Sequence, residues 1–146
     1  MTRTLRPWPI MVGLLVDLVG SLLLGVGYSI VKVGMDAGAG GDITDQITLT
    51  TTDYMVTSVF GLLFVVAGGY VAGRMARVRP TAHGLCVGVA VLAVSIVIEV
   101  LAPDSQAPMW FNIVSMIGVV PAATIGGRVA GKSTQANQPL QPTMPS

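Results

Sequence analysis

The sequence predicts an all-α fold: a polytopic bundle of four transmembrane helices, with a candidate two-plus-two parallel repeat. Composition is the first reason, because 52% of the 146 residues are hydrophobic and only 10% are charged. A soluble domain has about 25% charged residues. The second reason is that long apolar stretches alternate with short polar segments. A helix of about 20 apolar residues crosses the ~30 Å hydrocarbon core of a bilayer.

Four stretches are long enough to span a bilayer. They run over about residues 9–33, 54–73, 82–101 and 109–127. Helices are expected because lipid offers no water to unpaired backbone groups. A β-barrel would alternate in polarity in runs of about ten residues, and these stretches are apolar throughout. Residues 1–130 therefore form one membrane domain. Residues 131–146, rich in Ser, Thr, Gln, Asn and Pro, are expected to form a disordered cytoplasmic tail.

Charged residues between the stretches predict their orientation. Seven of the eight Lys and Arg precede the first stretch, separate the second from the third, or follow the fourth: Arg3, Arg6, Arg74, Arg77, Arg79, Arg128 and Lys132. The other two loops carry acids instead: Asp36, Asp42, Asp45, Asp53 and Asp104. Basic segments stay in the cytoplasm. We therefore expect a multi-pass membrane protein with both termini cytoplasmic.

A cleaved signal peptide is an alternative interpretation of the first stretch. Arg3 and Arg6 would be its charged region, and Ala37-Gly38-Ala39 resembles a cleavage site. The stretch is too long for a signal peptide and contains Asp17, so a span is preferred. A net charge of +1 gives no general attraction to nucleic acid. The expected partners are the lipid bilayer and either a second copy or another membrane protein.

Small residues recur at spacings that let helices approach closely. Four glycines of the first stretch follow a seven-residue period, and shorter ladders mark the other three. The predicted packing residues are Gly13, Gly20, Gly27 and Gly34; Gly68, Ala72 and Ala76; Gly69 and Gly73; Gly84 and Gly88; and Gly118, Ala122, Gly126 and Ala130. Glycine is common in membrane helices, so a single pair is weak evidence. The ladders of the second and fourth helices are stronger evidence.

The second and fourth helices also resemble each other. Val71–Ala76 aligns with Ile125–Ala130 at an offset of 54 residues, and both end in Gly-Arg-x-Ala. The match is compatible with a duplication of a helix pair in parallel orientation. Recurrent chemistry where helices leave the membrane is the alternative explanation.

Asp17 is the one acid well inside a predicted span. Placing a charged side chain near the bilayer centre costs about 2.5–3.5 kcal/mol. One hypothesis is a packing role, with Asp17 either protonated or paired with Arg74 or Arg128. The other is a site for proton- or cation-coupled transport. Pro121, in the middle of the fourth helix, should kink it, as a static bend or as a hinge.

The sequence shows no catalytic constellation, no His/Cys cluster for a metal and no phosphate-binding loop, so we expect no enzyme activity, no metal and no cofactor. The favoured function is that of a structural or interaction protein of the membrane, with helices packed through Gly and Ala faces. A small proton- or cation-coupled transporter or channel that uses Asp17 is the alternative.

The segment Gly68-Gly69-Tyr70-Val71-Ala72-Gly73-Arg74-Met75-Ala76-Arg77 resembles the end of the second helix in small four-helix bacterial inner-membrane proteins of uncharacterised function. The spacing of Gly13 and Asp17, and Gly126-Gly127-Arg128, add to the resemblance, which covers about residues 9–130. It implies a fold but no activity. Small multidrug-resistance transporters also have an acid in the first of four helices, but their loops are short. Fluoride channels share a Gly-Gly-Arg segment only superficially.

Overall fold

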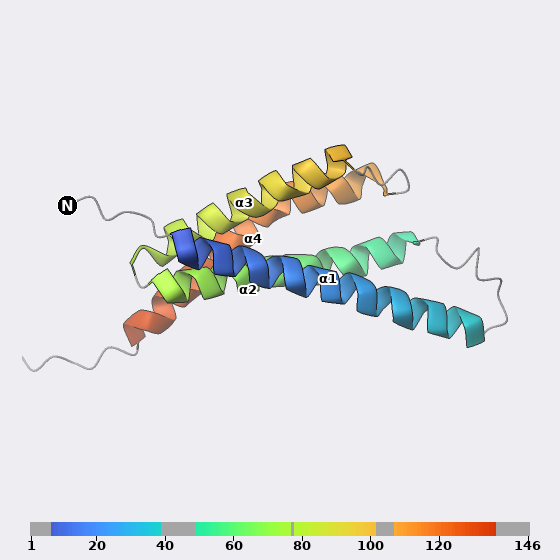
Figure 1. Ribbon diagram of the computed structural model, residues 1–146, viewed down its shortest axis with the longest axis horizontal. Helices are drawn as coiled ribbons and strands as arrows, with labels where there is room; N and C mark the ends of the chain where they lie inside the picture. The colour runs from blue at the N-terminus through green and yellow to red at the C-terminus, as the bar shows by residue number, and fades with distance from the viewer. Residues whose placement is uncertain (1–6, 39–48, 77, 102–106, 137–146) are drawn as a thin grey trace, which may run out of the picture.

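The computed structural model describes residues 7–38, 49–76, 78–101 and 107–136. They form four helices: α1 (Pro7–Gly38), α2 (Thr51–Ala76), α3 (Pro80–Leu101) and α4 (Met109–Ala136) (Figure 1). Each helix contains a candidate span of 22 to 29 residues. At ~1.5 Å per residue, the shortest span rises about 33 Å, enough to cross the hydrocarbon core. The predicted all-α bundle is confirmed, and the chain is an integral membrane protein with four spans.

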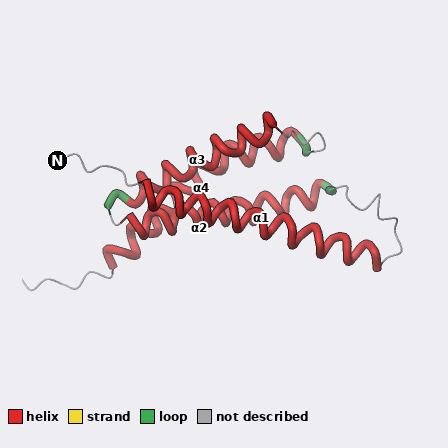
Figure 2. Tube along the Cα trace, viewed as in Figure 1, coloured by secondary structure: helices red, strands yellow, loops and turns green. Residues whose placement is uncertain are grey.

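The helices form two hairpins, α1 with α2 and α3 with α4. Figure 2 shows the hairpins together near the α2–α3 turn and spread apart towards their other ends. α2 packs against the other three helices, and α3 also packs against α1. Among the described residues, α1 and α4 make no contact. The backbones of the two hairpins therefore lie closer together at the end with the α2–α3 turn than at the other end.

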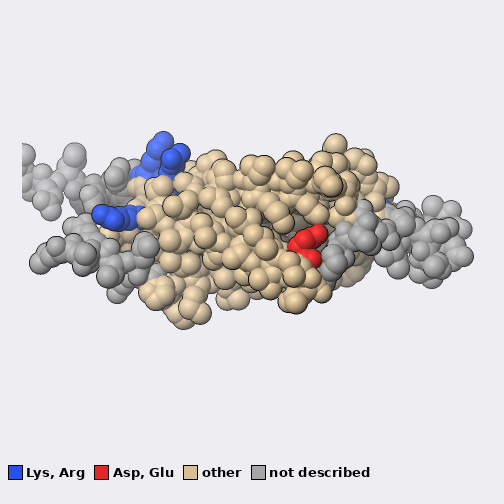
Figure 3. Space-filling view, turned by 90° about the horizontal axis from the view of Figure 1, so that it is seen from above, with Lys and Arg blue, Asp and Glu red and all other residues tan. Residues whose placement is uncertain are grey.

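The two ends differ in charge (Figure 3). We call the end with the α2–α3 turn the basic end, because Arg74, Arg79 and Arg128 lie there. We call the opposite end, where α2 begins and α3 ends, the acidic end, because Asp53 and Glu99 lie there. The placement of the basic end in the cytoplasm stays a prediction.

Helices α2 and α4 touch backbone to backbone near the basic end. A Cβ atom added to Gly69 would meet the carbonyl of Ala123, and one added to Gly126 would meet the carbonyl of Val66. Helices α1 and α2 are equally close, since a Cβ on Gly13 of α1 would lie 2.6 Å from the Gly68 carbonyl oxygen of α2. Only glycine allows backbones to approach this closely, because it has no Cβ atom. Close packing matters in a membrane, since lipid gives helices no hydrophobic reason to associate.

The remaining small residues divide by position. In α3 and α4, a Cβ on Gly84 would lie 2.6 Å from the Ala123 oxygen, and one on Gly88 would lie 2.9 Å from the Cα atom of Val120. Five more of the predicted packing residues also lie in helix contacts: Gly20 against Phe64, Gly73 against Ala130, Gly118 against Leu62, and Ala72 and Ala122 in the core. Gly27 and Gly34 have no described atom within 4 Å of such a Cβ. Within the described residues, the seven-residue seam of α1 is therefore in contact only in its first half.

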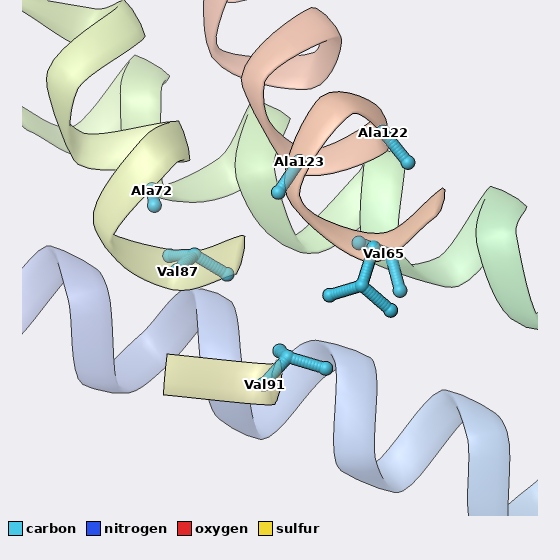
Figure 4. Packing of buried hydrophobic residues seen from close by; sticks show 7 residues of the cluster. Val65, Ala72, Val87, Val91, Ala122 and Ala123 are labelled. Atoms are coloured by element: carbon cyan, nitrogen blue, oxygen red, sulfur yellow. The ribbon is translucent and has the colours of Figure 1, made fainter. Parts of the chain in front are cut away.

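The core consists of small side chains. It is formed by Val65, Ala72, Val87, Val91, Val119, Ala122 and Ala123 (Figure 4). Large apolar side chains instead point outward, as Leu22, Leu23 and Ile30 do on α1. This arrangement is expected of a bundle whose surroundings are hydrocarbon, because burying a large side chain gains little there.

One pair of residues matched at the 54-residue offset meets in space, since a Cβ on Gly73 would lie 3.1 Å from the Cα atom of Gly127. The helix pairs are nevertheless not arranged symmetrically, because α3 packs against α2 whereas α1 does not contact α4 in the described part. A duplication stays a prediction. α4 runs to Ala136, beyond the boundary expected at residue 130, because no proline interrupts the chain before Pro139. Residues 137–146 lie outside the described residues.

The α2–α3 turn is short. Arg79 adopts a positive φ of 50°, a strained conformation for a residue other than glycine. Its carbonyl accepts hydrogen bonds from the backbone N–H groups of Ala82 (3.0 Å) and His83 (3.3 Å). Pro80 follows as the first residue of α3, where its missing N–H costs nothing. The turn thereby holds α2 and α3 side by side at the basic end.

At the acidic end, α1 and α2 are joined through Asp53. Its carboxylate accepts hydrogen bonds from the backbone N–H of Thr50 (2.6 Å) and the Thr50 hydroxyl (2.8 Å), forming the reciprocal cap of a helix start. It also accepts a hydrogen bond from the Tyr28 hydroxyl and forms an ion pair with Lys32. Lys32, the one basic residue away from the basic clusters, is thus matched by an acid.

We predict that Gly126→Ala lowers the free energy of unfolding in detergent by about 1–3 kcal/mol, because its Cβ has no space against Val66. Gly25→Ala is the matched control, since Gly25 faces open space and its replacement should cost nothing. Equal effects of the two substitutions would show that α2 and α4 are not in backbone contact.

We also predict that Asp53→Asn destabilises the protein by about 1–3 kcal/mol, because Lys32 then loses its counter-charge. In a double-mutant cycle, Asp53→Asn should lower the free energy of unfolding less in the Lys32→Met background than in the wild type. Thermal unfolding of the four variants measures the coupling. Strictly additive losses would contradict the ion pair.

Candidate functional site

Asp17 lies on the face of α1 that packs against α2. Gly13, one turn earlier, touches Gly68, and a Cβ on Gly68 would lie 3.3 Å from the Cβ of Asp17. Asp17 is only 3% exposed. Its Oδ1 atom has no hydrogen-bond partner in the described part of the chain. A buried carboxyl oxygen without a partner is costly and therefore points to a ligand or to water.

Asp17 lines a cavity of about 280 Å³ between the two hairpins. All four helices contribute to its walls, on the acidic side of the closely packed region. The polar members of the wall, besides Asp17, are Ser21, Thr57, Ser58, Ser95 and Ser115. The Ser58 hydroxyl is also buried without a partner, whereas the Thr57 hydroxyl donates to the Asp53 carbonyl at 2.8 Å. Two buried polar atoms without partners thus belong to one cavity.

The rest of the wall is aliphatic and aromatic, and includes Leu18, Val65, Val91 and Phe111. Asp17 is the one titratable side chain among the lining residues. An ionised carboxylate in such surroundings needs a compensating positive charge, because the walls provide none. The site can therefore hold a proton on Asp17 or a cation beside it.

The structure does not bring Arg74 or Arg128 to Asp17. Both are exposed at the basic end, and the Arg74 guanidinium donates to the Tyr70 hydroxyl at 3.2 Å. Where Gly13 meets Gly68, Asp17 lies four residues towards the acidic end and Arg74 six residues towards the basic end. The separation along the helices is therefore about 15 Å. No ion pair joins Asp17 to either arginine among the described residues.

A second cavity, also of about 280 Å³, lies between α3 and α4 towards the acidic end. It is lined by Glu99, Asn112 and Met116, and shares Ser95, Ile98, Phe111 and Ser115 with the cavity at Asp17. The Asn112 amide donates to a Glu99 carboxylate oxygen at 3.3 Å. The Phe111 ring packs against the ring of Tyr54 of α2, with the ring centroids 5.0 Å apart. Phe111 thus stands between the two cavities and touches both hairpins.

The serines of the cavity were not recognised as site residues from the sequence, where they looked scattered. A helical pattern could have found some of them. Ser21 follows Asp17 by four residues, and Ser115 lies midway between Phe111 and Val119 on one face of α4. Which faces turn towards one another required the structure. Pro121 lies in the continuous helix α4, exposed and beside the core residue Ala122.

Comparisons with known proteins identify no family. No protein-family model, no curated protein and no solved structure matches the chain. The resemblance to small bacterial inner-membrane proteins therefore stays a hypothesis. Within the described residues, no three His, Cys, Asp or Glu side chains lie close enough to hold a metal ion.

We predict that Asp17→Asn either lowers the free energy of unfolding by less than about 1 kcal/mol or increases it. The amide keeps the shape of the side chain, and removes a charge that no described residue balances. Chemical denaturation in micelles at neutral pH measures the difference. A loss of about 3 kcal/mol or more would reveal an ion pair that the structure does not contain.

Proposed function

We propose that the protein is a small transporter in which Asp17 binds a proton or a small monovalent cation during the transport cycle. The observation that carries this proposal is the carboxyl oxygen of Asp17, buried and without a partner, at the wall of a hydroxyl-lined cavity. A carboxyl with a packing role would have at least one hydrogen-bond partner. A transport carboxyl needs room for water and for its ligand.

The packing of the helices supports the proposal. Near the basic end the helices touch at Gly13, Gly69 and Gly126, whereas towards the acidic end the hairpins separate around the cavity. This is one of the two states that alternating access requires, with the site closed to one side. Pro121 removes a backbone hydrogen bond in α4 beside the closed region, so it is a candidate hinge for the opposite state.

We place the protein in the bacterial cytoplasmic membrane with both termini and the basic end in the cytoplasm. The support is the distribution of Arg74, Arg79 and Arg128 at one end and of acids at the other. In this orientation the cavity at Asp17 faces away from the cytoplasm. We propose no catalytic step.

A structural or interaction role is the second candidate. It is favoured by the half of α1 nearer the acidic end, where Gly27 and Gly34 face no described atom of the chain. A second copy of the protein could pack its own helix there. Gly27→Leu should then lower the fraction of oligomers seen by cross-linking in lipid vesicles, whereas Gly25→Leu, on another face, should not.

Transport is tested in liposomes that enclose a pH-sensitive dye. If the ligand is a proton, a potential imposed with potassium and valinomycin should drive proton flux through the wild type. If the ligand is a sodium ion, the wild type should instead dissipate an imposed sodium gradient. Asp17→Asn should fold normally and lose at least about 90% of the flux, because it cannot ionise. Ser29→Ala is the control, since this exposed hydroxyl of α1 bonds only its own helix at Gly25. Equal flux in wild type and Asp17→Asn would overturn the proposal.

A further inference from the structure

Glu99 is the second acid that faces a cavity. It lies near the end of α3, half-buried, and its carboxylate accepts a hydrogen bond from Asn112 of α4 at 3.3 Å. Asp53, another acid at this end, forms an ion pair with Lys32. No ion pair involves Glu99 among the described residues. Its negative charge is therefore directed at the cavity between α3 and α4.

This outer cavity adjoins the cavity at Asp17. The two share Ser95, Ile98, Phe111 and Ser115 in their walls. Two of these shared residues carry hydroxyl groups. Between Glu99 and Asp17, a solute would therefore meet two serines and the side chains of Ile98 and Phe111.

The opposite direction is closed. On the basic side of Asp17, a Cβ on Gly13 would lie 2.6 Å from the Gly68 carbonyl, and the carbonyls of Val66 and Ala123 lie as close to Gly126 and Gly69. Backbone contacts of this kind leave no space for a water molecule. These contacts close the basic side of Asp17 and leave only its acidic side for access.

We infer that Glu99 and Asn112 form an outer cation station, from which a small monovalent cation or a hydronium ion passes Phe111 to reach Asp17. Since this path serves the carboxylate of the proposed transporter, its role rests on that proposed function. The carboxylate of Glu99 attracts the cation, and the Asn112 carbonyl oxygen supplies a second ligand. A charge in a cavity with low-dielectric walls concentrates ions of opposite sign. Phe111, held by Tyr54, sets the size of ion that passes.

Thiol labelling tests the path without any transport measurement. The native Cys86 is replaced by Ala, and Ser115→Cys places one thiol at the wall shared by both cavities. The protein in nanodiscs is exposed to a trimethylammonium-bearing or a sulfonate-bearing methanethiosulfonate reagent. We expect the cationic reagent to react faster. Ser133→Cys, at the basic end, corrects for the intrinsic reactivity of each reagent.

Glu99→Gln should lower the cationic-to-anionic rate ratio by about tenfold, because it removes the charge but keeps the hydrogen bond from Asn112. Ser29→Ala, an exposed position on α1 that lines neither cavity, keeps the charge of Glu99 and should keep the ratio. No labelling of Ser115→Cys, or an unchanged ratio in Glu99→Gln, would overturn the inference. If this ratio falls while Asp17→Asn still transports, the proposed function fails alone. If Asp17→Asn stops transport and the ratio is unchanged, the outer station fails alone.

Discussion

The backbone contact between α2 and α4 is the constraint on which the rest of the structure depends. Gly69 lies on Ala123 and Gly126 on Val66, so neither helix can move closer or rotate without a collision. α1 and α3 are then added to this pair through Gly13, Gly84 and their neighbours. Since all of these contacts lie near the basic end, the helices are free to spread apart at the other end (Figure 1).

The separation of the hairpins determines the surroundings of the Asp17 carboxyl. One turn beyond the contact of Gly13 with Gly68, the space between the hairpins is wide enough for a cavity, and Asp17 lies at that level. Asp17 is therefore buried and faces the cavity, whose wall also includes Ser21 and Ser58. At the far end, the contact of Asp53 with Lys32 ties α1 to α2, so the opening lies between hairpins and not within one.

Much of the fold could be predicted from the sequence, because apolar length and small-residue spacing are local properties. The four spans and the packing at Gly69 and Gly126 follow from them. The lack of an arginine partner for Asp17 among the described residues could not be predicted, because it depends on the level at which the helices meet, which places Arg74 about 15 Å away. The open face at Gly27 was unpredictable for the same reason: a seven-residue period shows which residues share a face, but not how far the neighbouring helix follows it.

Infrared spectroscopy of the Asp17 carboxyl tests most directly whether the site is a wet cavity. At acid pH, the carbonyl stretch of the protonated side chain is identified by its loss in Asp17→Asn. After transfer to D2O, we predict that this band shifts as fast as solvent is exchanged, because the carboxyl lines a cavity next to the outer one. A band that stays unshifted until the backbone amides of the core exchange would show a dry, packed carboxyl and contradict the account.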